Sequence, residues 1–380
     1  MIVECEVRYV RIKWIEFTNI ETGLKIEKIN FYEDVTLLVG ISGAGKTQIL
    51  NAIKYSLNLA VRKDIILRPY NVSMGIFIDD TEYEWSYRID SVQNDLLVLA
   101  NREKYCFVYE KLTKNGDIVF ERNQDTINIV GYDKVPQPKK DESLLSQYSE
   151  DEKFEKLISG IRKLYSVEVE LAVRGGISTE SFSTLKTKVI DILKREKNIE
   201  FKVFSHLPVA MKIYIVKWHY KDLYIKIFEA VKGLFDEIED IDVVEDEERE
   251  LYLVTIQVYG KKLLQNDISN GMLKAIYYIV ELFTMSKDSL VLIDEFENGL
   301  GLNCIDSLSN LLLYERTDLQ FIITSHHPKV INEIEKNRWK IIGRNCEIIK
   351  NSDSNDYGIG NSQHNAYFNL INRWEYEGKI

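Results

Sequence analysis

Apolar and polar positions alternate with the period of a β-strand near the start of the chain. The stretches 10–15 and 25–31 both alternate, and 35–39 is an unbroken apolar run, which is typical of a parallel strand buried on both faces. Apolar residues then recur at helical spacing from 47 to 59. The segment 40–47 is therefore predicted to connect a buried strand to a helix.

The pattern changes to short strands from 71 to 131, which predicts an antiparallel β subdomain. Asn115-Gly116 is the pair favoured in a type I′ hairpin turn. The two prolines and three lysines of 134–140 predict a linker. A mainly helical insertion of about a hundred residues is expected to follow, because the chain after the linker has helical patterns. Helical periodicity marks it at 150–165, 182–197 and 222–235.

Residues 236–250 hold ten acidic residues and one basic residue. Such a run is typical of a solvated connection before the next strand, although it could also mark an interaction surface. A strand is predicted over 251–259 and a helix from Met272 onwards. Two further buried strands, 289–293 and 319–324, are separated by a helical stretch.

Composition places the 380-residue chain among ordered globular proteins, with 45% hydrophobic residues, 29% charged residues and 5 prolines. A net charge of −11 argues against a protein that coats nucleic acid by bulk charge, but it leaves room for a local basic patch. The early acids Glu4 and Glu6 do not fit a secretory signal, and no apolar run is long enough for a membrane span. A cytoplasmic protein is therefore expected. The cysteines are scattered without C-x-x-C spacing, which predicts reduced structural thiols at Cys5, Cys106, Cys304 and Cys346.

A phosphate-binding motif of the form G-x-x-x-x-G-K-[ST] lies between the predicted buried strand and helix. It reads Gly40-Ile41-Ser42-Gly43-Ala44-Gly45-Lys46-Thr47. Glycines let the backbone N–H groups approach phosphate oxygens, and the helix N-terminus adds positive partial charge. Lys46 is expected to contact the β and γ phosphates, and the Thr47 hydroxyl to bind Mg²⁺. The motif therefore predicts binding of ATP with Mg²⁺.

Acidic residues and a histidine follow the two later buried strands. Asp294 and Glu295 come directly after 290–293, and His326 follows 319–324. Because the carboxyl ends of parallel strands form the ligand-binding edge of α/β sheets, all three are expected there. We expect Asp294 to hold Mg²⁺, Glu295 to orient the attacking water and His326 to contact the γ phosphate. His327 could take the place of His326, which is favoured because it comes first after Thr324-Ser325.

The order of these motifs resembles the ATPase head of the ABC superfamily, and within it the SMC, RecF and OLD group. Asp294-Glu295-Phe296-Glu297-Asn298-Gly299-Leu300 is similar to a stretch of OLD-like ATPases, and Ser325-His326-His327-Pro328 to their switch histidine. The resemblance spans about residues 8 to 345. It implies an α/β P-loop NTPase fold with an antiparallel β subdomain and a helical insertion. The expected regions are an N-terminal ATPase lobe (1–147), a mainly helical insertion (148–248), a C-terminal ATPase lobe (249–345) and a C-terminal extension (346–380).

Heads of this family bind ATP between two copies, so the resemblance also implies a homodimer or a higher homo-oligomer. Ser269 and Gly271 correspond to the signature residues that contact the nucleotide of the other copy, although Ser269 could equally be an ordinary helix N-cap. Gln147 lies near the place of the family's Mg²⁺-sensing glutamine. Ser42 stands where the family commonly has Asn, and Gly301 where it has His or Asp.

The resemblance implies an ATPase whose closing heads switch or scaffold a partner. OLD-like nucleases carry a Toprim domain after the head, whereas 52 residues follow Pro328 here. The resemblance therefore implies a separate effector, such as a nuclease or toxin, of the kind used in bacterial antiphage defence.

Three other classes fit less well. A DNA-repair or chromosome-maintenance ATPase that clamps DNA would want a basic groove, which the net charge does not favour. A transporter subunit shares the motif order but not the β subdomain and helical insertion. A GTPase would carry an N-K-x-D motif, and the sequence has none.

Overall fold

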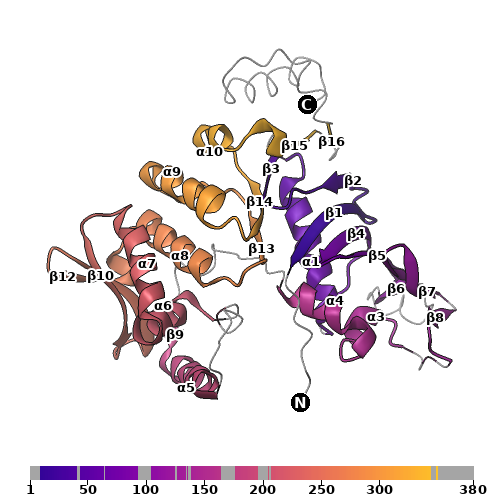
Figure 1. The fold of residues 1–380 in the computed structure, drawn as a ribbon, viewed down its shortest axis with the longest axis horizontal. Helices are drawn as coiled ribbons and strands as arrows, with labels where there is room; N and C mark the ends of the chain where they lie inside the picture. Colours follow the sequence, from indigo (N-terminus) through magenta and orange to yellow (C-terminus); the bar gives the residue numbers. More distant parts are fainter. Residues whose placement is uncertain are drawn as a thin grey trace, which may run out of the picture. The chain divides into compact units, whose positions relative to one another are not determined.

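Most of the predicted strands and helices are present in the structure (Figure 1). The computed structural model describes residues 9–40, 43–63, 65–92, 104–124, 126–133, 135, 138–163, 176–195, 204, 207–343 and 348–349. They belong to two units. The first comprises 1–166, 288–294 and 318–380, and the second comprises 167–287 and 295–317.

An antiparallel sheet of seven strands dominates the first unit, in the order β2-β1-β4-β5-β6-β7-β8. Its strands are β1 (Val10–Asn19), β2 (Lys25–Asn30), β4 (Tyr70–Ile78), β5 (Thr81–Val92), β6 (Lys104–Lys114), β7 (Asp117–Asn123) and β8 (Ile127–Ile129). The predicted antiparallel subdomain is confirmed, and β1 and β2 extend it. The turn between β6 and β7 has φ of 50° at Asn115 and 88° at Gly116, the left-handed pair that a type I′ turn requires.

A second sheet in the same unit has the order β13-β14-β3-β15-β16. Its strands are β3 (Val35–Val39), β13 (Leu290–Ile293), β14 (Gln320–Thr324), β15 (Trp339–Ile342) and β16 (Ile348–Ile349). The first four are parallel, and β16 is antiparallel to β15. Every residue of β3, β13 and β14 is buried, which explains their unbroken apolar sequences. The α/β class is thus confirmed.

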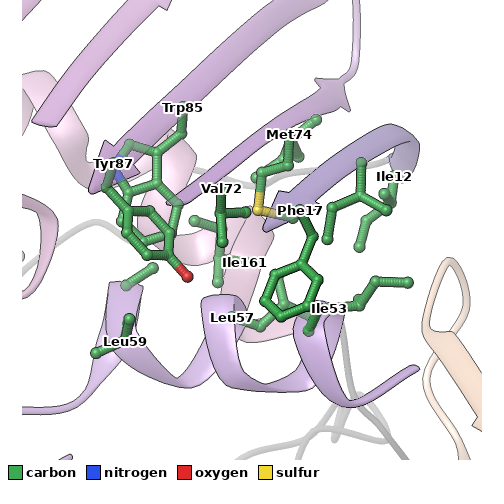
Figure 2. Close-up of a cluster of buried hydrophobic side chains, with 14 of the residues drawn as sticks. Ile12, Phe17, Ile53, Leu57, Leu59, Val72, Met74, Trp85, Tyr87 and Ile161 are labelled. Carbon is green, nitrogen blue, oxygen red and sulfur yellow. The ribbon is translucent and has the colours of Figure 1, made fainter. Parts of the chain in front are cut away.

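The first unit also contains helices (Figure 1). They are α1 (Lys46–Val61), α3 (Leu144–Gln147), α4 (Glu152–Lys163) and α10 (Pro328–Glu333), with a 3₁₀ turn at Lys336–Arg338. Helix α1 contacts both β1 and β14, so its apolar residues serve both sheets. Figure 2 shows Ile53 and Leu57 of α1 among Phe17, Val72 and Met74 of the antiparallel sheet. This core holds the start of α1, and with it the phosphate motif, in place.

One side chain, Gln320 of β14, joins the two sheets. Its Oε1 accepts a hydrogen bond from the Ile12 N–H at 2.9 Å, and its Nε2 donates to the Ile12 carbonyl at 2.8 Å and to the Tyr32 carbonyl at 2.9 Å. The register of β1 against β4 shifts between Ile12 and Trp14. The amide therefore pairs with the backbone of β1 at an irregular point, as a neighbouring strand would.

The predicted linker over 134–140 is only partly a free connection. Three of its residues, 134, 136 and 137, lie outside the described residues. The Lys139 carbonyl accepts a hydrogen bond from Arg122 at 3.2 Å, and Arg122 forms a buried ion pair with Glu110 at 2.6 Å. The end of the segment is thus fixed to the antiparallel sheet.

The second unit combines a small sheet with five helices among its described residues. Its elements are β9 (Ile177–Ser178), α5 (Thr179–Arg195), α6 (Val209–His219), α7 (Lys221–Lys232), β10 (Ile238–Asp246), β11 (Leu251–Val258), β12 (Lys261–Leu264), a 3₁₀ turn (Gln265–Asp267), α8 (Asn270–Thr284), α9 (Leu302–Asn310) and a π-helical turn (Leu311–Glu315). Strand β11 lies between β10 and β12 and also pairs with β9. Helices α6 and α7 contact β10 (Figure 1). The three predicted helices of the insertion are confirmed as α4, α5 and α7.

Residues 238–246 of the acidic run form strand β10, so the interpretation as a solvated connection is wrong for them, whereas 247–250 form an exposed turn before β11. Ile238, Ile241 and Val243 of β10 are buried, with two residues between the first two positions and one between the next. The spacing is irregular because the pairing with β11 shifts register between Ile238 and Asp240. Lys217 of α6 pairs with Asp240 at 2.6 Å and with Asp242 at 3.1 Å, which offsets part of the charge.

The structure also bears on the predictions for the cysteines, for membrane-spanning helices and for the C-terminal extension. Cys106 and Cys304 are buried thiols outside any disulfide, as expected, while Cys5 and Cys346 lie outside the described residues. None of the described helices is long and apolar enough to cross a bilayer. Of the predicted C-terminal extension, only 348–349 is described.

Candidate nucleotide-binding site

The phosphate motif connects β3 to α1, as its sequence context predicts. Ile41 and Ser42 lie outside the described residues. Gly43 and Gly45 have φ of 80° and 97°, a left-handed conformation that glycine adopts without steric cost. A Cβ on Gly43 would meet no atom within 4 Å, so the loop is open there. Gly45 is the N-cap residue of α1 and makes no side-chain cap hydrogen bond, so the N-terminus of the helix faces the loop.

Gly40, the first motif residue, is required for a different reason. A Cβ at this position would lie 2.4 Å from the carbonyl oxygen of Ile342, at the end of β15. Such a distance is far below van der Waals contact, so only glycine fits. The start of the loop is thus held against the neighbouring parallel strand.

Lys46 folds back over the loop that it ends. Its Nζ donates a 2.8 Å hydrogen bond to the Gly40 carbonyl, and the residue is only 6% exposed. A buried ammonium with a hydrogen-bond partner is a strong donor for phosphate oxygens. The geometry agrees with the role predicted for Lys46.

Thr47, Asp294 and Thr324 form a chain of hydrogen bonds at the carboxyl edge of the parallel sheet. The Thr47 hydroxyl donates to Asp294 Oδ2 at 2.7 Å, and the Thr324 hydroxyl donates to Asp294 Oδ1 at 2.6 Å. Ile293 pairs with Ile323 in the parallel ladder, which brings the next residues of both strands together. Hydroxyl and carboxylate oxygens are hard ligands suited to Mg²⁺, which usually takes one or two protein ligands beside phosphates and water. The residues present fit that ion.

The contact of Thr324 with Asp294 was not anticipated from the sequence as a separate role. Strand register supplies the signal, since Thr324 ends the strand next to the one that Asp294 follows. A hydrogen bond to a metal-binding carboxylate fixes its orientation. Thr324 is therefore a further residue of the candidate site, and it acts by orienting the Asp294 carboxylate.

Glu295 follows Asp294 and begins the last segment of the second unit. It is exposed and has φ of 47°, which is rare for a residue with a side chain. The turn after it is closed by the Asn298 N–H, which donates to the Glu295 carbonyl at 2.8 Å. Asn298 Nδ2 also lies 3.4 Å from Glu295 Oε2. The left-handed backbone at Glu295 therefore belongs to a tight turn that follows β13.

Two histidines follow β14, and their contacts distinguish them. His327 caps α10, and its Nδ1 accepts a 3.3 Å hydrogen bond from the Lys329 N–H. The His327 N–H in turn donates to Ser325 Oγ at 3.1 Å. His326 is half-buried, two residues beyond Thr324 at the edge of the sheet. The capping role of His327 favours His326 as the residue for phosphate contact.

Ser269 and Gly271 lie at the start of α8 in the second unit. Ser269 is exposed, and its Oγ accepts a hydrogen bond from the Met272 N–H at 3.3 Å, so it is an N-cap. A Cβ on Gly271 would lie 3.3 Å from both the Gly299 oxygen and the Gly301 nitrogen. A small residue is therefore favoured at 271, and the N-cap geometry leaves the serine at an open helix N-terminus.

Gln147 ends α3 in the first unit. Its Nε2 donates to the Lys139 carbonyl at 3.0 Å and to the Glu142 carbonyl at 2.9 Å, and its Oε1 accepts from the Lys139 N–H at 2.9 Å. Both ends of the amide are engaged with its own loop. A role as a Mg²⁺-sensing glutamine would require these hydrogen bonds to break.

Comparisons with known proteins place similarity in several parts of the chain. Residues 190–332 match a family model described as "AAA domain, putative AbiEii toxin, Type IV TA system". This range contains Ser269, Asp294, Glu295 and His326, but not the phosphate motif. A search of curated proteins finds no match.

Among solved structures, SMC head domains are similar to this chain. An SmcHead bound to the C-winged helix domain of ScpA has 14% identity and a TM-score of 0.48, over 88% of this chain and 93% of that chain. An Smc head with an extended coiled coil, bound to the C-terminal domain of ScpA derived from Pyrococcus furiosus, has 12% identity and a TM-score of 0.46, over 91% and 98%. An SMC head domain from Thermotoga maritima has 12% identity and a TM-score of 0.40, over 87% and 93%.

Proposed function

We propose that this protein is an ATPase of the ABC head type that binds Mg-ATP and hydrolyses it. The observation that carries the proposal is the hydrogen-bond chain from Thr47 through Asp294 to Thr324, which begins two residues after the left-handed Gly45 of the phosphate motif. There, three segments far apart in the sequence bring two hydroxyl groups and one carboxylate together. A merely structural polar cluster would not need a buried lysine and open glycine loop beside it.

Each residue has a distinct part in the proposed reaction. Lys46 and the loop amides bind and neutralise phosphate oxygens, while Thr47 and Asp294 hold Mg²⁺. When bound, the ion neutralises charge on the β and γ phosphates. Glu295 orients the attacking water, and His326 donates a hydrogen bond to the γ phosphate.

The nucleotide is proposed to be enclosed by a second copy of the chain. Ser269 is exposed and caps α8, a helix of 15 residues, so the amides of its first turn can contact an anion. Because Gly271 has no side chain, the first turn of α8 can lie close to the backbone of Gly299 and Gly301. Two copies, each offering Ser269 and Gly271 to the nucleotide of the other, would form the ATP-dependent dimer.

We further propose that this switch acts on a separate effector in bacterial antiphage defence, inside the cytoplasm. The match to a model named for a putative AbiEii toxin of a type IV toxin–antitoxin system supports a defence role, as does the OLD-like Asp294–Leu300 stretch. The insertion, 148–248, is the segment proposed to convey the change to a nuclease or toxin chain. Contact with nucleic acid is not required by this mechanism.

The test is the mass in solution of the Glu295→Gln protein, measured by light scattering on a sizing column with and without Mg-ATP. Slowed hydrolysis should trap the dimer, so the mass should rise with ATP. Ser269→Arg, combined with Glu295→Gln, should abolish the rise. Ser183→Arg is the matched control, because Ser183 is also exposed and lies in the same unit.

Nucleotide binding by the same proteins separates the possible failures. If ATP binds but the mass stays constant, the signature role of Ser269 is wrong and the ATPase works without head dimerisation. If no ATP binds at all, the proposed function is wrong. Loss of the rise with Ser183→Arg would show that any added charge disrupts assembly.

A further inference from the structure

The turn that begins at Glu295 has an unfavourable backbone and is nevertheless well defined. Glu295 has φ of 47° and Gly299 has φ of 71°, so two left-handed residues lie within five positions. For the glutamate this conformation costs free energy, since its Cβ crowds the backbone. Such a turn persists only when surrounding contacts determine it. The contacts that do so come from α8.

Lys274 of α8 makes the central contact. Its Nζ donates a hydrogen bond to the Asn298 carbonyl, and the residue is only 7% exposed. A Cβ on Gly299 would lie 3.5 Å from Lys274 Cδ, so the stem of the lysine packs along the turn. Burying an ammonium is costly unless it is hydrogen-bonded, which makes this bond a strong restraint.

Two apolar contacts join the same turn to α8. Phe296 is fully buried, and its ring lies edge-on to Tyr278, with centroids 5.8 Å apart. At the start of α8, the backbone of Gly271 lies close to Gly299 and Gly301. A Cβ on Gly271 would be 3.3 Å from the Gly299 oxygen and from the Gly301 nitrogen. The turn and the helix therefore behave as one body. That body carries Glu295 at one end and Ser269 at another.

We propose that Lys274 is a positioning residue for ATP hydrolysis. By holding the Asn298 carbonyl, it keeps the Glu295 turn in its left-handed conformation and ties it to the helix whose first turn carries the signature residues. Contact made at Ser269 then bears on the position of Glu295 in the same chain. This inference rests on the proposed function and adds a residue to it that does not touch the nucleotide.

The test compares three substitutions in the full chain. Lys274→Met keeps the length of the apolar stem and removes the donor, whereas Lys274→Arg restores a donor. Misplacing Glu295 should lower kcat about tenfold or more in Lys274→Met, with KM for ATP changed less than about twofold. Lys274→Arg should retain kcat within about threefold. If Lys274→Met lowered kcat only through lost packing, Lys274→Arg would not be expected to retain kcat.

Lys212→Met is the matched control. Lys212 is likewise a buried lysine of the second unit, 2% exposed, and it pairs with Glu281 of α8 at 2.6 Å. Its loss should destabilise the unit without moving the Glu295 turn, so kcat per folded molecule should be retained.

A second measurement needs no nucleotide. Amide hydrogen exchange of residues 296–300 should be at least several-fold faster in Lys274→Met than in wild type, and near wild type in Lys274→Arg and Lys212→Met. Unchanged exchange and unchanged kcat in Lys274→Met, with an active wild type, would overturn the inference and leave the proposed function standing. A wild-type protein that does not hydrolyse ATP would overturn both.

Discussion

Thr324 donates a 2.6 Å hydrogen bond to Oδ1 of Asp294, and this bond sets the orientation of the carboxylate. The other oxygen, Oδ2, is thereby turned toward the Thr47 hydroxyl at 2.7 Å. Three residues from three separate segments depend on the strand register that makes 294 and 324 neighbours. The candidate Mg²⁺ site is therefore a property of the parallel sheet as much as of the phosphate motif.

Thr324→Val should weaken the response to Mg²⁺ while leaving the fold intact. Valine has nearly the same shape but cannot donate to Asp294, so the carboxylate loses its fixed orientation. The Mg²⁺ concentration that gives half-maximal ATP binding should rise about tenfold, as for other residues that orient metal ligands. Titration of ATP binding with Mg²⁺ measures this. Thr36→Val, in the adjacent strand β3, is the control, because Thr36 is equally buried but accepts a hydrogen bond from the Tyr32 N–H instead.

Gly40→Ala should destabilise the first unit and abolish ATP binding. The new methyl group would collide with the Ile342 carbonyl, so β3 and β15 would have to separate at the start of the loop. We expect a loss of about 1–3 kcal/mol in the free energy of unfolding, measured by urea denaturation. Gly23→Ala meets no atom within 4 Å and has φ of 74°, so it should cost only about 1 kcal/mol and spare binding. Equal losses in both variants would contradict the collision.

Glu295→Gly should be more stable than Glu295→Ala, although both should be inactive. Glycine relieves the left-handed strain at φ of 47°, a gain of roughly 1 kcal/mol, while alanine keeps it. Denaturant unfolding of the two variants measures the difference. At Glu297, whose φ is not positive, the order should reverse, because glycine there only adds conformational entropy to the unfolded chain. The same order at both positions would rule out strain at Glu295.

Stability should fall steeply above pH 10 because of buried tyrosines. Burial raises the pKa of Tyr87 well above its ordinary value of 10, and its hydroxyl lies 2.8 Å from Ser56 Oγ. Above pH 10 the unfolded tyrosine loses its proton while the folded one keeps it. The folded state then binds more protons, so the free energy of unfolding falls as pH rises, by up to about 1.4 kcal/mol per pH unit for each such group.

Urea denaturation between pH 9 and pH 11.5 tests this prediction. Tyr87→Phe should make the decline shallower, because one proton is removed from the balance. Burial also raises the pKa of Tyr277 in the second unit, so a decline should remain in that variant. An identical slope in wild type and Tyr87→Phe would refute the contribution of Tyr87.

Local pattern was sufficient for most of the elements. Strand β3, helix α1 and strands β13 and β14 were predictable because each has a single clear period or an unbroken apolar run. Helix α6 was not predicted, since its apolar residues lie all around it and leave no periodic face. Strand β10 was misinterpreted because a register shift and its many acids hide the alternation.

The residues and contacts of the candidate site also differ in whether the sequence predicts them. Residues within one continuous motif, such as Lys46 and Thr47, follow from the sequence. Contacts between distant segments do not, and Gln320 is the clearest case: its amide pairs with Ile12, 308 positions away, and no local pattern marks a glutamine for that use. The role of Ser42 stays a prediction, because it lies outside the described residues.

The acidic strand β10 has a further consequence for how copies of this protein meet. Among the described strands it is at one end of its sheet, and Glu239 and Glu245 on it are exposed. An outer strand offers backbone groups to any other strand that comes alongside. Two copies brought together at this strand would place carboxylates against carboxylates, and the repulsion disfavours that contact. The acidic side chains of β10 therefore disfavour edge-to-edge stacking of copies into fibres.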